Sequence, residues 1–155
     1  QACNRPSKKT RKPAWFIKHV SKLAPARRSR ARDLWAENSS KACYDLGVLL
    51  TKGRGGETDH ETAAKYFARS CSEGMVKACH NLGLMCLKGL GVSADGVQAR
   101  VLLDRACSEG SFRSCYVLAV ALQRGLAGPA EPGAAQGFLR RACEGGELMA
   151  CDHEL

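Results

Sequence analysis

Apolar residues recur along residues 41–155 at the three- and four-residue spacing of amphipathic helices. Ala63, Phe67 and Cys71 step by four along one face, and Cys79 and Leu82 begin a similar stripe in the next segment. No segment alternates between apolar and polar residues for long enough to indicate a strand. The pattern therefore predicts an all-α protein.

The apolar pattern repeats every 36 residues, and several residue types keep the same register. The matching sets are Cys43, Cys79, Cys115 and Cys151; Cys71, Cys107 and Cys143; Leu46, Leu82 and Leu118; and Gly74, Gly110 and Gly146. A fixed period with this many coincidences is typical of a repeat protein. Three complete copies cover 41–76, 77–112 and 113–148, and residues 149–155 begin a fourth.

Each copy is predicted to form two helices joined by a loop. In the first copy, "KACYDLGVLLTKG" is one helix and "ETAAKYFARSCSEG" is the other. Gly74 and its equivalents follow the second helix, where a left-handed C-terminal cap is expected. The third copy carries "GPAEPG" between its helices, so its loop is expected to be longer or less regular.

Each copy ends with two cysteines eight positions apart, as in "RACSEGSFRSC". Eight residues of continuous helix separate two Cα atoms by about 12 Å, whereas a disulfide needs them roughly 4.4 to 6.8 Å apart. The Ser-Glu-Gly segment between them supplies a turn that brings them together. We therefore predict the disulfides Cys71–Cys79, Cys107–Cys115 and Cys143–Cys151, each joining the end of one repeat to the start of the next.

The competing interpretation of the cysteines is structural zinc. Zinc sites favour ligands two to four residues apart and supplied in fours, a pattern that the eight-residue spacing fits badly. Nine cysteines in 155 residues instead indicate an oxidising compartment. Cys43 lacks a repeat partner, because Trp35 occupies the equivalent position, so it is either free or paired with Cys3. Cys86 aligns with leucines and is expected to be a buried thiol.

The net charge of +9 lies entirely in the first 40 residues, which hold eleven Lys or Arg against two acids. Residues 1–30 are therefore interpreted as a basic N-terminal arm with a short amphipathic helix at 14–24. Residues 31–40 are interpreted as a degenerate capping half-repeat. The arm residues expected to contact a membrane or a partner are Trp15, Phe16, Lys18, Lys22, Arg27, Arg28, Arg30 and Arg32.

Four interpretations of this arm remain open. Its Lys and Arg could neutralise phosphates along RNA, or lie on an anionic lipid surface with Trp15 and Phe16 inserted. It could instead dock on a multisubunit complex. It could also be the remainder of a targeting region, because mitochondrial presequences are similarly rich in Arg and poor in acids. The chain starts at Gln1 rather than Met, so we expect an upstream segment to have been removed.

No known catalytic spacing occurs in the sequence, and no apolar run approaches the roughly 18 residues needed to cross a bilayer. His60, His80 and His153 stand beside acids or a cysteine, but each is expected to be a surface or capping residue. We therefore predict no enzyme, no catalytic residue, no metal, no cofactor and no small-molecule substrate.

The segment 78–110, "ACHNLGLMCLKGLGVSADGVQARVLLDRACSEG", resembles the Sel-1-like repeat, a relative of the tetratricopeptide repeat. The residues that match the family pattern are Ala78, Leu82, Gly83, Gly89, Gly91, Asp95, Ala99, Ala106 and Gly110. The third copy departs from it, with Ala119 and Ala127 at glycine positions. The resemblance covers about 41–155 and implies a right-handed α/α solenoid of about three and a half repeats.

Within this family, the paired cysteines resemble two groups. One consists of bacterial secreted cysteine-rich repeat proteins, and the other is a mitochondrial intermembrane-space factor for cytochrome c oxidase assembly. The resemblance implies a scaffold rather than a catalyst. Our leading hypothesis is an accessory subunit of a respiratory-chain complex on the intermembrane-space side, with protein subunits as partners. The alternatives are a mitochondrial ribosomal component with an RNA-contacting arm and a soluble assembly factor.

Overall fold

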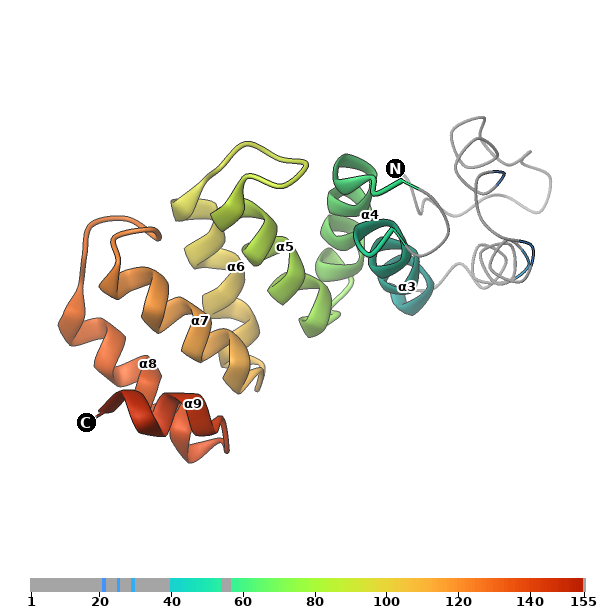
Figure 1. The fold of residues 1–155 in the computed structure, drawn as a ribbon. Helices are drawn as coiled ribbons and strands as arrows, with labels where there is room; N and C mark the ends of the chain where they lie inside the picture. Colours follow the sequence, from blue (N-terminus) through green and yellow to red (C-terminus); the bar gives the residue numbers. More distant parts are fainter. Residues whose placement is uncertain (1–20, 22–24, 26–28, 30–39, 54–56, 155) are drawn as a thin grey trace. The chain divides into compact units, whose positions relative to one another are not determined.

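The computed structural model of the 155-residue chain describes residues 40–53 and 57–154, together with the isolated residues 21, 25 and 29 (Figure 1). It divides into two compact units, 1–75 and 76–155, which are described separately. The predicted arm helix at 14–24 and the half-repeat at 31–40 fall almost wholly outside the described residues. Within the described residues every regular element is helical, which confirms the all-α prediction.

The described part of the N-terminal unit contains the helix pair α3 (Ser40–Thr51) and α4 (His60–Ser72). The two helices pack against each other at a glycine of α3, Gly47. A Cβ added at Gly47 would lie 2.7 Å from Cε1 of Phe67, so the absence of a side chain at this position lets the Phe67 ring pack directly on the α3 backbone. Tyr66 and Phe67 are both fully buried, and the Tyr44 ring packs against Phe67 with centroids 5.8 Å apart.

The C-terminal unit contains two further helix pairs and the start of a third. The elements are α5 (Val76–Lys88), α6 (Gly96–Ser108), α7 (Phe112–Gln123), α8 (Pro132–Glu144), α9 (Leu148–Cys151) and the short 3-10 helix η1 (Asp152–Glu154). In Figure 1 α5 and α7 lie in front of α6 and α8. The observed helices follow the predicted repeat register throughout this unit.

The core of the C-terminal unit is built from small and medium-sized side chains rather than aromatic ones. Leu103, Leu118, Leu122 and Leu139 are fully buried, and alanines fill the positions between them. Alanine at these positions lets neighbouring helices approach closely, as α/α repeats require. Ala119, which stands where the family pattern has glycine, is itself fully buried in this core.

The second helix of each repeat ends in the left-handed turn that the glycine spacing predicts. Gly74, Gly110 and Gly146 have φ angles of 92°, 96° and 91°, a region that L side chains seldom adopt. At the middle turn, Gly110 N–H donates to the Cys107 carbonyl and Ser111 N–H donates to the Ala106 carbonyl. This is the Schellman arrangement, and it reverses the chain within three residues.

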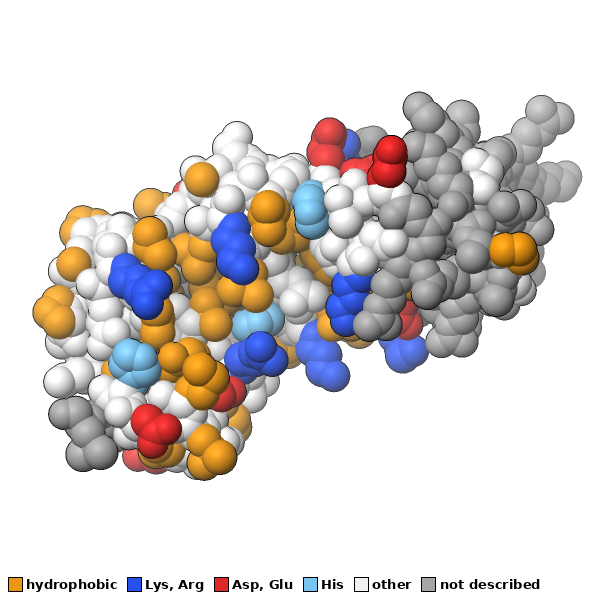
Figure 2. Space-filling model, in the orientation of Figure 1, with side chains coloured by type: hydrophobic (Ala, Val, Ile, Leu, Met, Phe, Trp, Pro, Cys, Tyr) orange, Lys and Arg blue, Asp and Glu red, His pale blue; other side chains and the backbone are white. Residues whose placement is uncertain are grey.

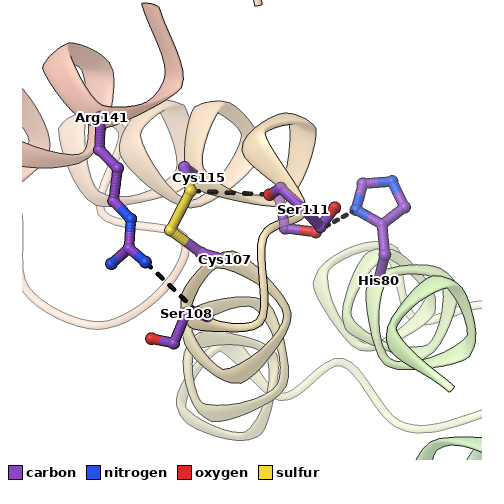
Figure 3. Close-up of a disulfide and its surroundings, with 7 residues drawn as sticks. His80, Cys107, Ser108, Ser111, Cys115 and Arg141 are labelled. Carbon is purple, nitrogen blue, oxygen red and sulfur yellow. Dashed lines mark hydrogen bonds between the residues drawn. A yellow bond between two sulfur atoms is a disulfide. The ribbon is translucent and has the colours of Figure 1, made fainter. Parts of the chain in front are cut away.

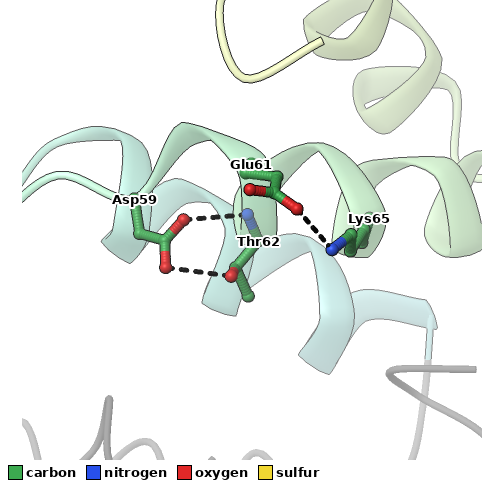
Figure 4. Close-up of polar contacts among 4 residues, drawn as sticks. All are labelled: Asp59, Glu61, Thr62 and Lys65. Atoms are coloured by element: carbon green, nitrogen blue, oxygen red, sulfur yellow. Dashed lines mark hydrogen bonds and ion pairs between the residues drawn. The ribbon is translucent and has the colours of Figure 1, made fainter. Parts of the chain in front are cut away.

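The starts of the second helices differ between repeats. Asp59 accepts hydrogen bonds from the backbone N–H and the hydroxyl of Thr62, both at 2.9 Å (Figure 4). Asp95 accepts from the Gln98 N–H at 2.9 Å. Glu131 occupies the same position before α8 but makes no side-chain capping bond there. The third repeat therefore begins its second helix with proline, Pro132, in place of a capping carboxylate.

Candidate interaction surface

Two of the three disulfide pairs expected from the spacing are drawn together by the glycine turns. The structure joins Cys107 to Cys115 and Cys143 to Cys151, and in both pairs the Cα atoms lie 4.8 Å apart. Each disulfide ties the last turn of one helix to the first turn of the next. Figure 3 shows the first of them at the corner between α6 and α7.

The other cysteines divide into bonded and free. Cys43, Cys71 and Cys79 are each disulfide-bonded. Of the two states predicted for Cys43, free or bonded, the free thiol is therefore wrong. Its expected partner, Cys3, lies outside the described residues. Cys86 is a free, buried thiol, and burial raises its pKa, with a smaller contribution from Asp95.

A short chain of polar side chains connects α5 to α7 beside the Cys107–Cys115 disulfide. Nδ1 of His80 lies 2.8 Å from the Ser114 hydroxyl, and Ser114 donates to the Ser111 hydroxyl at 2.7 Å (Figure 3). The Ser114 hydroxyl thus contacts both the His80 ring on α5 and the Ser111 hydroxyl at the start of α7. Ser114 is fully buried. The group therefore holds two helices together and does not present an accessible nucleophile.

His80 sits in an environment that disfavours its charged form. Burial lowers the pKa of His80, and the nearby Arg113 guanidinium lowers it further. The His80–Ser114 contact joins α5 to α7 at this point. Hence α5 and α7 present neighbouring faces of the C-terminal unit, with His80 between them.

The outer faces of α5 and α7 carry the same arrangement of side chains, which we call the α5–α7 face. On α5 it consists of Lys77, Asn81, Leu84 and Lys88, and on α7 of Arg113, Val117, Val120 and Arg124. Positions four, seven and eleven residues apart fall on one side of a helix. The four basic residues are exposed and the four between them are partly buried. Two rows of cations thus flank a largely apolar strip.

The charges on this face are not balanced by neighbouring acids. Neither α5 nor α7 contains an Asp or Glu, and none of the four cations has an ion-pair partner among the described residues. The acids of this unit lie on α6, α8 and the turns, where Glu131 pairs with Arg100 at 2.7 Å and Glu109 with Arg105 at 3.0 Å. Figure 2 shows Lys and Arg side chains over α5 and α7 with hydrophobic side chains between them.

The sequence predictions missed this face. The eleven-residue spacing of Lys77 and Lys88, repeated 36 residues later by Arg113 and Arg124, was the signal that could have revealed it. The whole-chain charge conceals it, because residues 41–155 are neutral in total and the basic arm accounts for the excess. The arm residues that were predicted to contact a membrane or a partner all lie outside the described residues.

His60 and His153 are not grouped with other possible metal ligands of the described residues. Within the described ranges no three His, Cys, Asp or Glu side chains are placed to hold a metal ion. His153 packs against the Tyr116 ring, with centroids 5.7 Å apart. In the same part of the chain, no helix is long and apolar enough to cross a membrane.

Comparison with known proteins finds the repeat unit directly. A family model described as Sel1 repeat matches residues 40–75, 76–111 and 113–147. No curated protein matches the chain.

Several solved structures share the fold. The chain is 27% identical to a protective antigen of uropathogenic Escherichia coli with an SLR fold, with a TM-score of 0.69, covering 75% of this chain and 26% of that one. It is 25% identical to a Sel1 repeat protein from Oxalobacter formigenes, with a TM-score of 0.70, covering 88% and 55%. The chain thus spans about a quarter and about half of the length of these two proteins.

A third similar structure is the cysteine-rich protein B of Helicobacter pylori. It is 21% identical, with a TM-score of 0.62, and the match covers 79% of this chain and 95% of that one. At this identity the likeness shows the fold alone.

Proposed function

The chain belongs to the Sel1 repeat family, whose helix pairs form a protein-interaction scaffold, and from this premise we propose a specific setting for it. We propose that it is a non-catalytic accessory subunit of a mitochondrial respiratory-chain complex, located on the intermembrane-space side. Its repeats would contact partner subunits, and its basic arm would anchor to the complex or to anionic lipid.

The disulfides are the observation that carries this proposal. At least two repeats are closed by a disulfide, and Cys43, Cys71 and Cys79 are also bonded. Such bonds persist in secreted proteins and other oxidising settings and are rare where thiols are kept reduced. The arm favours the mitochondrial setting over secretion, because its Arg-rich and acid-poor composition is typical of presequences.

A scaffold role is also consistent with the side chains that the fold exposes. The serine nearest to a histidine, Ser114, is buried and already hydrogen-bonded. The α5–α7 face instead offers an apolar strip between cations, which suits contact with another macromolecule.

The test is native fractionation of a gently solubilised extract, with and without RNase, followed by mass spectrometry of the co-migrating proteins. We expect co-migration with respiratory-chain subunits at constant stoichiometry, unaffected by RNase. Short-lived, substoichiometric association would instead identify an assembly factor. Absence of every respiratory-chain subunit from the fraction would refute the proposal.

The second candidate is a ribonucleoprotein component, and the charge of the arm favours it. Eleven Lys or Arg within 40 residues are enough for several phosphate contacts, and such binding weakens steeply with salt. Release of the protein by RNase in the same experiment would support this function in place of the first.

A further inference from the structure

Two of the four cations of the α5–α7 face, Lys77 and Arg113, are placed where the fold itself does not need them, whereas Lys88 and Arg124 lie at the C-terminal ends of α5 and α7, where the helix dipole favours a cation. Lys77 and Arg113 are the second residues of α5 and α7, next to the positive end of each helix dipole. A cation there is disfavoured rather than stabilising. Since residues 76–155 hold equal numbers of basic and acidic residues, a general excess of positive charge does not explain the face either.

The equivalent face of the N-terminal unit has an internal ion pair that neutralises one of its two cations. Its four positions are Lys41, Asp45, Val48 and Lys52, and Lys41 pairs with Asp45 at 3.2 Å. In the C-terminal unit the position of Asp45 is taken by Asn81 and Val117. The N-terminal unit thus has an acid beside its first cation, and the C-terminal unit has neutral side chains at that position. The cations of the C-terminal unit are therefore available to bind a partner.

We propose that the α5–α7 face binds an acidic segment of a partner protein, in which carboxylates flank an apolar centre. This inference rests on the proposed scaffold function and adds the chemistry of the partner. The carboxylates would meet Lys77 and Arg113 on one side and Lys88 and Arg124 on the other. The apolar centre would cover Leu84, Val117 and Val120.

The charges exclude the nearest alternative occupant. The chain's own arm, residues 1–30, carries ten Lys or Arg and no acid, so it is repelled by four unpaired cations. The strip contains no aromatic side chain, and single-stranded nucleic acids are bound on aromatic platforms, so the strip disfavours a nucleic acid. The two aromatic residues of α7 lie elsewhere, Phe112 beside Gly145 and Tyr116 against the His153 ring. Charge complementarity with apolar contact at the centre therefore selects an acidic polypeptide.

The spacing of the two cation rows defines a suitable probe. Eleven residues of helix separate them by about 16 Å. A helical peptide laid along the face needs glutamates eleven positions apart, with leucines four and seven positions after the first. The probe is an alanine-based helix of about fifteen residues with this pattern, compared with the same peptide in which glutamine replaces both glutamates.

The measurement is a methyl NMR titration of the full-length, oxidised protein. We expect the glutamate peptide to shift the methyl signals of Leu84, Val117 and Val120, and the glutamine peptide to shift them far less. Methyl groups of Ile17, Val20 and Leu23 report separately on the arm, which attracts acidic peptides without specificity.

A matched pair of charge reversals tests the contribution of the face. Arg124→Glu should weaken peptide binding roughly fivefold to tenfold, because it replaces an attraction by a repulsion at one corner. Arg140→Glu changes the net charge equally on the exposed surface of α8 and should change binding less than about twofold. Circular dichroism of both variants checks that they remain folded.

Three results would overturn the inference. In the first, the glutamate peptide shifts only the methyl signals of the arm, or the Arg124→Glu and Arg140→Glu variants bind this peptide equally well. In the second, a uridine oligonucleotide of similar length shifts the face methyls at lower concentration than the peptide. In the third, the face methyls shift on dilution of the protein alone, with a dimer in sedimentation. None of these affects co-migration with a respiratory complex, so the two proposals fail independently.

Discussion

Gly83 lies where the Leu103 side chain of α6 packs directly against α5. A Cβ at this position would lie 2.8 Å from Cγ of Leu103, which is fully buried. Gly137, in the middle of α8, has nothing within 4 Å of its added Cβ. The same substitution is therefore expected to have opposite effects at the two glycines.

Gly83→Ala should lower the free energy of unfolding by about 1–3 kcal/mol, because an extra methyl group in a filled core forces neighbours to shift. Gly137→Ala should raise it by about 0.5–1 kcal/mol, because alanine favours a helix that glycine weakens. Urea unfolding of the two variants beside the wild type measures both values. Equal effects of the two substitutions would contradict the close approach.

His80 should make the stability of the C-terminal unit depend on pH. Its pKa in the folded state is lowered by burial and by Arg113, so the unfolded chain binds a proton more readily. The free energy of unfolding should thus be highest above the ordinary histidine pKa of about 6.5 and fall as the pH drops below it.

Urea unfolding between pH 7.5 and 5 checks this dependence, with His80→Gln as the comparison, since glutamine keeps a polar side chain that does not titrate. We expect the variant to lose less stability than the wild type over this range. A wild-type curve parallel to that of the variant would show that His80 does not control the acid response.

At the scale of the helix, the capping residues determine the stability of the first turn of the second helix in each repeat. Asp59 accepts two hydrogen bonds from Thr62 (Figure 4), whereas the equivalent Glu131 makes no capping bond and pairs with Arg100 instead. The neighbouring Glu61–Lys65 ion pair is well exposed, and such pairs contribute little.

Asp59→Ala should destabilise the start of α4 by about 1 kcal/mol, because the Thr62 N–H then loses its acceptor. Asp59→Asn keeps an acceptor at the same position and should cost clearly less. Hydrogen exchange of the first-turn amides of α4 gives the readout, with the amides of α8 as an internal reference. Unchanged exchange of the first-turn amides of α4 in the alanine variant would argue against the role of the cap.

At the scale of the whole molecule, the disulfides reinforce turns that the backbone already makes. Replacing Cys107 and Cys115 together by serine should cost about 2–3 kcal/mol, the value expected for a loop of this length. Non-reducing peptide mapping should recover the peptides of Cys107–Cys115 and Cys143–Cys151 linked, with Cys86 as a free thiol. The same map tests the predicted pairs Cys71–Cys79 and Cys3–Cys43, and free thiols at Cys71 and Cys79 would disprove the first.

Most of the fold could be predicted because its determinants are local and occur three times. Helix periodicity, the glycine at each left-handed turn and the eight-residue cysteine spacing all lie within a dozen residues of chain. Because each of these signals recurs every 36 residues, it is not a coincidence. Cys107, Gly110 and Cys115, for example, have equivalents at the same positions of another repeat. The predicted family membership is confirmed by the Sel1 repeat match, while the respiratory-chain setting remains a proposal.

The sequence by itself therefore determined the helix pairs, their register and the positions at which the chain turns. Only the tertiary structure decided which face of each helix is covered, because that depends on contacts between residues about 30 positions apart, such as His80 with Ser114 and Arg100 with Glu131. Those contacts pair the acids with cations on α6 and leave the cations of α5 and α7 without acids. The charges of residues 76–155 balance in total, but they form a one-sided surface when the helices pack.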